Sequence, residues 1–277
     1  MTDLLDFLDS RWSFYLGCTQ GQLRDGGRHI VTRPEAASGA ESPWPLRRGP
    51  IALLTTSHGW VMSLPAELCE RARALCLGCD FEELVEEGDR LQQDWFDSLD
   101  QGPDTDAREQ DRGDRGYRRM NRIAPDLKLR GWCHYLHWYC DAASWTPRHD
   151  EHVRPITEAQ SELWQQWLSW PGPMVGPKLH DQFEIADAFG YVLEGKLVSA
   201  AQVEASSKDF AWEYGIDTRP EFRGRGFATA VVNSVTSFIM EQGRIPWHYH
   251  DHYNKASMRL PEKAGFFRYC EGLFSAV

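Results

Sequence analysis

The segment Arg223–Ala228 constrains the fold more than any other feature of this chain. It reads Arg-Gly-Arg-Gly-Phe-Ala, follows the strand-like run Ala211–Thr218, and opens the apolar, helix-like run Phe227–Gln242. A strand, a glycine-rich turn and a helix in this order aim backbone amides at whatever lies beyond the strand. Helix amino termini carry unpaired N–H groups and about half a positive charge, so the segment predicts an anion site that suits a pyrophosphate.

The spacing of the glycines narrows the kind of anion. The segment matches neither G-x-G-x-x-G nor G-x-x-x-x-G-K-[ST], which are typical of dinucleotide and nucleoside triphosphate sites. It reads R-x-x-G-x-A, with Arg223, Gly226 and Ala228 at the fixed positions. This pattern resembles the [RQ]-x-x-G-x-[GA] motif of the GCN5-related N-acetyltransferases, the GNAT superfamily. In that family the motif lies between the fourth strand and the third helix and holds the pyrophosphate of acetyl-CoA.

Two flanking segments carry the same resemblance. Upstream, Ile216–Phe222 is a short apolar strand end that leads into Pro-Glu-aromatic just before the arginine. Downstream, Asn254–Phe266 resembles the closing signature N-x-x-[AS]-x-x-L-x-x-K-x-G-F. The resemblance extends from the neighbourhood of Val153 to the carboxyl terminus and leaves the first half of the chain unexplained.

The resemblance implies acetyl-CoA, or another acyl-CoA, as co-substrate and requires no metal. It also implies that the fourth and fifth strands splay apart, so that unpaired backbone groups bind the pantetheine arm and the acetyl carbonyl sits at the gap. The residues expected to bind the cofactor are Ile216, Asp217, Thr218, Arg223, Gly224, Arg225, Gly226, Phe227, Ala228, Thr229, Asn254 and Ser257.

Acyl transfer to an amine needs a base, because the attacking nitrogen must be neutral. Ile216 and Thr218 occupy positions that resemble the core-facing pair of the family, so strand alternation places Glu213 on the opposite face. Glu213 is therefore the carboxylate predicted to accept the proton, directly or through water. The alternative is a solvated strand residue or a salt-bridge partner.

The predicted fifth strand, Ile245–Asp251, supplies two further catalytic candidates. Tyr249 lies five residues before Asn254, where relatives carry a catalytic Glu or His, and it is expected to donate a hydrogen bond or relay a proton. His250 is a second candidate base. Alternation also places His248, His250 and His252 on one face, which resembles a metal ligand set. Core histidines or substrate contacts are the favoured interpretation, since the family needs no metal.

One residue departs from the family pattern. Relatives carry a tyrosine after the leucine of the last motif, as general acid toward the CoA sulfur, whereas this chain has Pro261 after Leu260. Proline lacks the N–H that would bond back to Ser257, so we expect the helix to kink or break near Leu260. Tyr249, Tyr253 or water must then reprotonate the thiolate. The departure also keeps open a second function, a degenerate acyl-CoA-binding module with a regulatory or scaffolding role.

The predicted fold class is α+β with a mixed sheet, in two domains. Residues 151–277 form the GNAT-like catalytic domain with splayed central strands. Residues 1–150 form an α/β lobe that is either substrate-capping or a degenerate second copy of the same fold. In the lobe we expect helices over Asp3–Trp12, Pro65–Leu77 and Glu82–Leu99, strands over Pro50–Leu54, Gly59–Leu64 and Arg130–Cys140, a loop over Gln20–Arg48, and a flexible acidic and Gly-rich loop over 100–119. In the catalytic domain we expect strands over Val153–Ile156, Phe189–Glu194, Lys196–Ala205 and Phe210–Thr218 and a helix over Thr157–Trp170.

Composition bounds the partners of the chain. A formal net charge of −11 makes nucleic acid a poor partner and favours a cationic substrate. The amino terminus is acidic where a secretory signal would be basic, and no apolar run approaches the roughly 20 residues of a membrane span, so we expect a cytoplasmic protein. The prediction is thus an N-acetyltransferase that acts on a small amine by direct attack in a ternary complex. The sequence does not distinguish a monomer from a homodimer.

Seven cysteines, an odd number, indicate reduced thiols. Cys76 and Cys79 form a C-x-x-C pair with Cys69 one helical face away, which suits either a metal or redox site or three small core residues. No second C-x-x-C completes a zinc site, so the core interpretation is favoured. His134 and His137 have opposite strand parity and are expected to lie on different faces.

Overall fold

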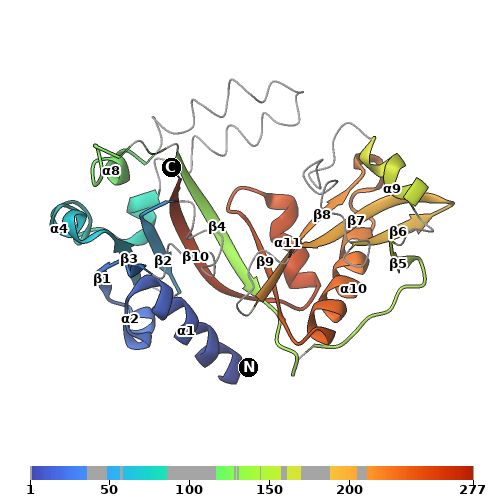
Figure 1. Cartoon of the computed structure of the whole chain (residues 1–277), viewed down its shortest axis with the longest axis horizontal. Coiled ribbons are helices and arrows are strands. Elements are labelled where there is room, and N and C mark those ends of the chain that lie inside the picture. Colours follow the sequence, from blue (N-terminus) through green and yellow to red (C-terminus); the bar gives the residue numbers. More distant parts are fainter. Residues whose placement is uncertain are drawn as a thin grey trace. The chain divides into compact units, whose positions relative to one another are not determined.

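The computed structural model describes residues 2–35, 49–56, 59–85, 117–127, 129, 131–143, 145–156, 161–169, 188–204 and 211–276 (Figure 1). These residues form the mixed α+β fold that the sequence predicts. They divide into two compact units. Unit 1 comprises Met1–His137, Tyr249–Lys255 and Arg268–Val277, and unit 2 comprises Trp138–His248 and Ala256–Phe267.

Unit 1 contains the strand order β1-β3-β2-β10-β4. β1 (Arg28–Thr32) is parallel to β3 (Trp60–Leu64), while β2 (Ala52–Thr55) is antiparallel both to β3 and to β10 (Phe267–Ala276). All five residues of β3 are buried, so this strand is covered on both faces. The remaining elements of the unit are α1 (Thr2–Leu16), α2 (Gln20–Arg24), η2 (Ala66–Leu68), α4 (Cys69–Cys76), α8 (Arg118–Asn121) and β4 (Gly131–Tyr139), whose last two residues belong to unit 2.

The core of unit 1 joins residues 51–132 to the C-terminal strand β10. Cys69, Cys76 and Cys79 are buried in it beside apolar residues that include Leu273 of β10. All seven cysteines are free, and burial raises the pKa of the Cys76 thiol to about 11. The core interpretation of the C-x-x-C pair is therefore confirmed.

The loop predicted over Gln20–Arg48 is wrong where the structure describes it. α2 begins after Thr19, whose hydroxyl accepts from the Gln22 amide at 3.2 Å while the Gln22 side chain accepts from the Thr19 amide at 2.9 Å. This reciprocal capping box, rather than apolar periodicity, starts the helix. β1 likewise depends on its pairing with the distant β3, and so its five residues carry little local signal.

Several other predictions fall wholly or partly outside the described residues. Of the predicted helix Glu82–Leu99, residues 82–85 are helical and the rest is not described. Most of the predicted loop over 100–119 is also outside. The helix at Asp3–Trp12 and the strands at Pro50–Leu54 and Gly59–Leu64 are confirmed as α1, β2 and β3.

Unit 2 contains the strand order β9-β8-β7-β6-β5. These strands are β5 (Val153–Pro155), β6 (Ala188–Leu193), β7 (Lys196–Glu204), β8 (Ala211–Thr218) and β9 (Ile245–Asp251), whose last three residues belong to unit 1. The predicted hairpin between β6 and β7 is confirmed. Glu194 and Gly195 at its turn have φ of 50° and 77°, the left-handed pair that a two-residue hairpin requires.

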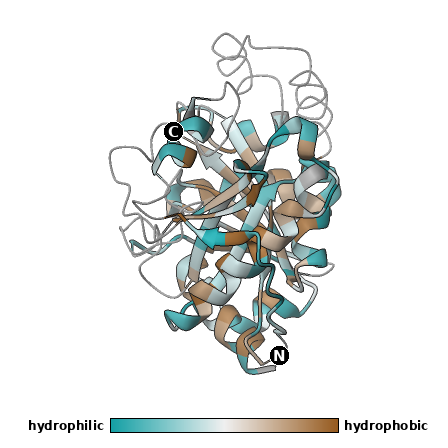
Figure 2. Cartoon of the chain, turned by 90° about the vertical axis from the view of Figure 1, so that its right-hand side faces the viewer, coloured by the Kyte–Doolittle hydropathy of each residue, from teal (hydrophilic) through white to brown (hydrophobic). Residues whose placement is uncertain are grey.

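One helix of unit 2 begins directly after the glycine loop. α10 (Phe227–Glu241) lies along β6, β7 and β8 (Figure 1). Its buried residues recur with helical spacing at Phe227, Val231, Val235 and Ile239, and Figure 2 shows hydrophobic and hydrophilic residues alternating along the helices. The other helices are α9 (Ser161–Leu168), η6 (Pro220–Phe222) and α11 (Lys255–Lys263). Within the described residues, no helix has the length and apolar character that a membrane span requires.

Of the kink or break predicted near Leu260, the break is wrong. α11 continues through Pro261 to Lys263. Proline removes one hydrogen bond of the helix, but the next turn still closes, because the amide of Ala264 donates to Leu260 O at 3.0 Å and that of Phe266 donates to Pro261 O at 2.9 Å. The local loss is thus insufficient to end a helix that these later bonds hold in place.

Candidate cofactor-binding and active site

Two glycines shape the loop between β8 and α10. Gly224 and Gly226 have φ of 75° and 89°, and Gly226 is the residue before the first helical position. An L-residue in the left-handed region costs roughly 1–2 kcal/mol, whereas glycine adopts it freely. The predicted turn is therefore formed as the glycine spacing implies, and α10 begins directly after it.

The side chain of Arg223 connects this loop to the end of β8 by a hydrogen bond and an ion pair. Its Nε donates to the carbonyl oxygen of Thr218 at 3.1 Å, and its guanidinium lies 3.7 Å from a carboxylate oxygen of Asp217. The Thr218 hydroxyl lies 2.8 Å from that of Ser199 on the neighbouring strand. Arg223 thus positions the loop, while the guanidinium of Arg225 lies 4.9 Å from the centre of the Phe227 ring.

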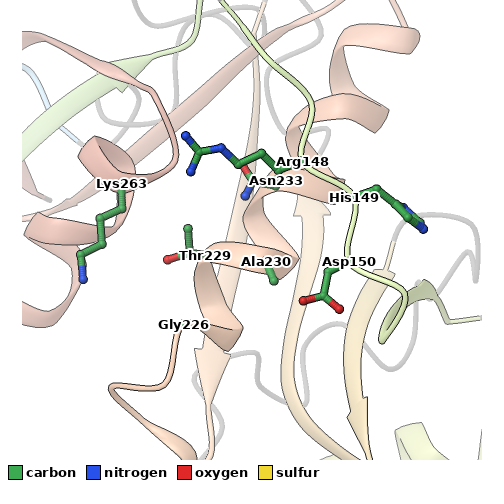
Figure 3. A pocket seen from close by; sticks show the side chains of 8 residues that line it. All are labelled: Arg148, His149, Asp150, Gly226, Thr229, Ala230, Asn233 and Lys263. Atoms are coloured by element: carbon green, nitrogen blue, oxygen red, sulfur yellow. The ribbon is translucent and has the colours of Figure 1, made fainter.

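A pocket of about 430 Å³ lies at the amino terminus of α10 (Figure 3). In Figure 3 the side chains of Arg148 and Thr229 point toward Lys263, which lies at the left of the view. His149 and Asp150 lie at the right. Two cations and a helix amino terminus around one hollow attract anions, and the single carboxylate offsets this in part. The lining residues are Arg148, His149, Asp150, Gly226, Thr229, Ala230, Asn233 and Lys263.

The sequence identified only part of this pocket. Gly226 and Thr229 are among the predicted cofactor residues, and Lys263 belongs to the closing motif. Arg148 comes from the segment before β5, which the sequence presents only as a linker. The sequence shows that Arg148 is charged, but no motif or sequence spacing relates it to α10.

The strands β8 and β9 separate at Glu213. Their parallel pairing covers Ala211 with Ile245, Trp212 with Pro246 and Glu213 with Trp247, and among the described residues no later position of β8 has a register partner on β9. β8 nevertheless continues to Thr218. This is the splayed pair that the family resemblance implies, and beyond Glu213 the register between β8 and β9 does not continue.

Glu213 therefore occupies the last paired position before the strands part. It is 4% exposed, which excludes the solvated alternative weighed for it. Burial of a carboxylate next to a gap suits a proton acceptor, but a buried ion-pair partner has the same exposure. Its catalytic role stays a prediction.

Tyr249 and His250 belong to unit 1, whereas Glu213 belongs to unit 2. The Tyr249 ring packs edge-on against Tyr135, with centroids 5.3 Å apart. His250 is buried, its Nδ1 lies 2.8 Å from the carbonyl oxygen of Asp251, and burial lowers its pKa to about 4. Its imidazole is neutral at pH 7, as a base must be.

The three alternating histidines do not share one environment. His248 is buried between the rings of Tyr214 and Phe266, at centroid distances of 5.3 and 6.4 Å. β9 ends at Asp251, so His252 lies outside the strand and stacks on His134 at 4.4 Å. The core interpretation fits His248 and His250, but it does not describe His252.

The remaining predicted cofactor residues flank the loop and α11. Ile216 and Asp217 are half-buried at the end of β8. The amide of Asn254 donates to Asp251 O at 2.9 Å and closes the turn before α11, while Ser257 lies in the first turn of that helix. No ligand contact tests these assignments, which stay predictions.

One comparison with known proteins concerns this same region of the chain. Residues 175–271 match the family model described as GNAT acetyltransferase. A GNAT-family acetyltransferase structure from Colwellia psychrerythraea is 15% identical, covers 68% of this chain and 73% of its own, and has a TM-score of 0.45. A GNAT-family structure from Novosphingobium aromaticivorans is 18% identical, covers 53% of this chain and 66% of its own, just under two thirds, and has a TM-score of 0.42. No curated protein matches the chain.

Proposed function

We propose that this chain, whose C-terminal half belongs to the GNAT superfamily, is an acyl-CoA-dependent N-acyltransferase that uses acetyl-CoA. The acceptor is a small cationic amine, which attacks the acyl carbon directly in a ternary complex. The observation that carries the proposal is the glycine loop before α10, which borders a cationic pocket in the same unit as the parted strands β8 and β9.

The donor site follows from charge and from backbone geometry. The pyrophosphate of CoA lies against the amino terminus of α10, where Gly226 allows close approach and Thr229 offers a hydroxyl. Arg148 and Lys263 compensate the phosphate charges. A pocket of about 430 Å³ falls within the range of small-molecule sites and accommodates part of the cofactor.

The chemistry takes place beyond Glu213. The part of β8 beyond Glu213, where its register with β9 ends, faces the amides of the pantetheine arm. The amine nitrogen forms a bond to the acyl carbon, its proton passes to Glu213 directly or through water, and the C–S bond then breaks. The thiolate takes up a proton and leaves as free CoA. The sequence also nominates Tyr249 and His250 as proton relays and Tyr253 as a proton donor to the thiolate; all three belong to unit 1.

The acceptor class rests on the charge of the chain. A formal net charge of −11 raises the local concentration of cations at the surface and speeds their association. An ammonium substrate benefits from this field and loses its extra proton before it attacks.

Thiol release separates the candidate functions. We expect purified protein to bind CoA in calorimetry and to release free thiol from acetyl-CoA when offered a panel of small amines. Glu213→Gln lowers this release at least tenfold and retains CoA affinity, whereas Glu241→Gln, an exposed glutamate at the end of α10, leaves both unchanged. Unchanged turnover in Glu213→Gln removes that residue from its role.

A second function is favoured by one observation. Pro261 occupies the position of the usual tyrosine, and α11 passes through it without a replacement hydroxyl at that position. A degenerate module that binds acyl-CoA without efficient turnover would lack the general acid in the same way. CoA binding without thiol release across the amine panel would identify it.

A further inference from the structure

Unit 1 contains a cluster of potential metal ligands that the acyl-transfer proposal does not use. His134 comes from β4, His252 from the turn after β9, and Glu271 from β10. Each offers one ligand atom, and the three atoms all lie within 4.8 Å of one another. We propose that His134, His252 and Glu271 bind a divalent transition-metal ion, zinc in the first place.

The positions of the ligand atoms support this assignment. Nε2 of His134 lies 2.7 Å from Oε1 of Glu271, and Nδ1 of His252 lies 3.3 Å from the same oxygen. Ligand atoms about 2.0–2.2 Å from a tetrahedral zinc lie roughly 3.3–3.6 Å apart, so small shifts of the side chains admit the ion. Two imidazoles and one carboxylate form a donor set that zinc uses in proteins, and three protein ligands leave a position for water.

His252 supplies a separate argument. Its Nδ1 is buried, and its approach to Oε1 of Glu271 at 3.3 Å is too poorly aligned for a hydrogen bond; the described part of the chain offers it no other. A buried nitrogen without a well-formed hydrogen bond costs free energy unless another group occupies its lone pair. A cation between this nitrogen and the carboxylate satisfies both.

Neighbouring side chains hold His134 and Glu271 in place. Nδ1 of His134 lies 3.2 Å from the hydroxyl of Tyr253, which lies 3.2 Å from the hydroxyl of Tyr117. A partner on the second ring nitrogen fixes the orientation of a metal-binding imidazole. Arg268 pairs with the other carboxylate oxygen of Glu271, so Oε1 remains directed at the two histidines.

Access to the cluster is unequal among its members. The His134 side chain is fully buried, whereas that of His252 is 36% exposed. An ion therefore enters from the side of His252. The three ligands and their partners all belong to unit 1, so the proposed metal site is independent of acyl transfer.

The test uses the full-length protein, first stripped with a chelator and then titrated with Zn²⁺ alone or with Co²⁺ as a visible probe. We expect one equivalent of bound metal, a d–d absorption spectrum of four-coordinate Co²⁺, and a thermal midpoint that rises with Zn²⁺ and falls again on chelation. His252→Gln and Glu271→Gln each weaken binding at least tenfold. Tyr253→Phe, which retains all three ligands, weakens it less.

His29 provides the matched control. Its Nε2 lies 2.9 Å from Asp25, so it is also a histidine paired with a carboxylate, but it is not a member of the three-residue cluster. His29→Gln leaves the stoichiometry and affinity unchanged. The proposal is overturned if the wild-type protein binds no equivalent and shows no Zn²⁺-dependent midpoint, or if affinity is the same in His252→Gln and Glu271→Gln. Because the midpoint is measured on the wild-type chain, a variant that fails to fold does not protect the proposal.

Discussion

The loop before α10 and the histidine cluster of unit 1 are assembled in opposite ways. The loop, Arg223–Ala228, is six consecutive residues whose conformation follows from two glycines and a helix start. The cluster joins His134 to Tyr253 and Glu271, which are 119 and 137 residues away in sequence. A local motif is thus expected to tolerate changes elsewhere, whereas a long-range network couples its members to the stability of the unit.

The largest effect should come from the network. His134→Leu removes a fully buried partner of Glu271 and leaves its carboxylate short of a hydrogen bond, so we expect the unfolding free energy to fall by about 3 kcal/mol. Denaturant unfolding in the presence of chelator measures this. His29→Leu, from a more exposed pair, is expected to cost less than about 1 kcal/mol. Equal losses of unfolding free energy in the two variants would mean that the long-range network stabilises the unit no more than an exposed pair does.

The next effect is the pH dependence of stability. We expect it in unit 1, because unit 1 contains the buried His137, whereas the loop contains no histidine. Burial lowers the pKa of His137 to about 3, with smaller contributions from His250 and His134, whereas unfolded histidine titrates near about 6.5. Below that pH the unfolded chain binds more protons, so stability is fully retained above pH 6.5 and is lost as pH falls toward 3. Between pH 7 and 5 this histidine should account for a loss on the order of 2 kcal/mol.

Denaturant unfolding of wild type and His137→Gln at several pH values in that range measures the contribution. The wild-type protein should lose stability more steeply than the variant as the pH falls. His29→Gln, at a partly exposed histidine, should follow the wild-type curve. Parallel curves for wild type and His137→Gln would contradict the assignment.

The pocket should respond in binding rather than in stability. Arg148→Ala and Lys263→Ala each remove one cation from the lining of the pocket, and each is expected to weaken CoA binding about tenfold, or about 1.4 kcal/mol. Calorimetry with CoA measures the change, and raised salt should reduce it. Arg154→Ala, an exposed arginine on β5 outside that lining, serves as the control. A loss in Arg154→Ala equal to the others would indicate only a general effect of charge.

The smallest effect separates loop conformation from loop function. Gly226 and Gly243 have φ of 89° and 69° at opposite ends of α10, and a Cβ added at either meets nothing within 4 Å. Alanine at each should cost about 1 kcal/mol of stability through backbone strain alone. We expect only Gly226→Ala to weaken CoA binding as well, because Gly226 borders the pocket and Gly243 does not. Equal CoA affinity in both variants would argue against a phosphate site there.

Local signals predicted much of unit 2. The hairpin at Glu194 and Gly195 and the helix after Gly226 are confirmed, since each depends on turn residues. The parting of β8 from β9, which the family resemblance implies, is confirmed as well. The same reasoning failed at Pro261, because a helix interior also depends on the bonds that follow the proline.

Unit 1 was predicted less completely. α2 and β1 were interpreted as loop, and β10 was not assigned at all. β10 pairs with β2, and the hydroxyl of Ser275 in it accepts from the amide of Ile51 at 2.9 Å. Ser275 and Ile51 are 224 residues apart, so the strand is stabilised by a distant partner while its own alternation is weak.

The sequence by itself determined the conformation of the glycine loop before α10, the family of the C-terminal half and the class of cofactor that we propose for it. These depend on backbone conformations that glycine permits and on residues within one or two turns of each other. Tertiary structure alone decided that Arg148 borders the loop and that His134, His252 and Glu271 converge. No spacing of residues in the sequence predicts these contacts, because they form only when segments that are distant in the chain pack together.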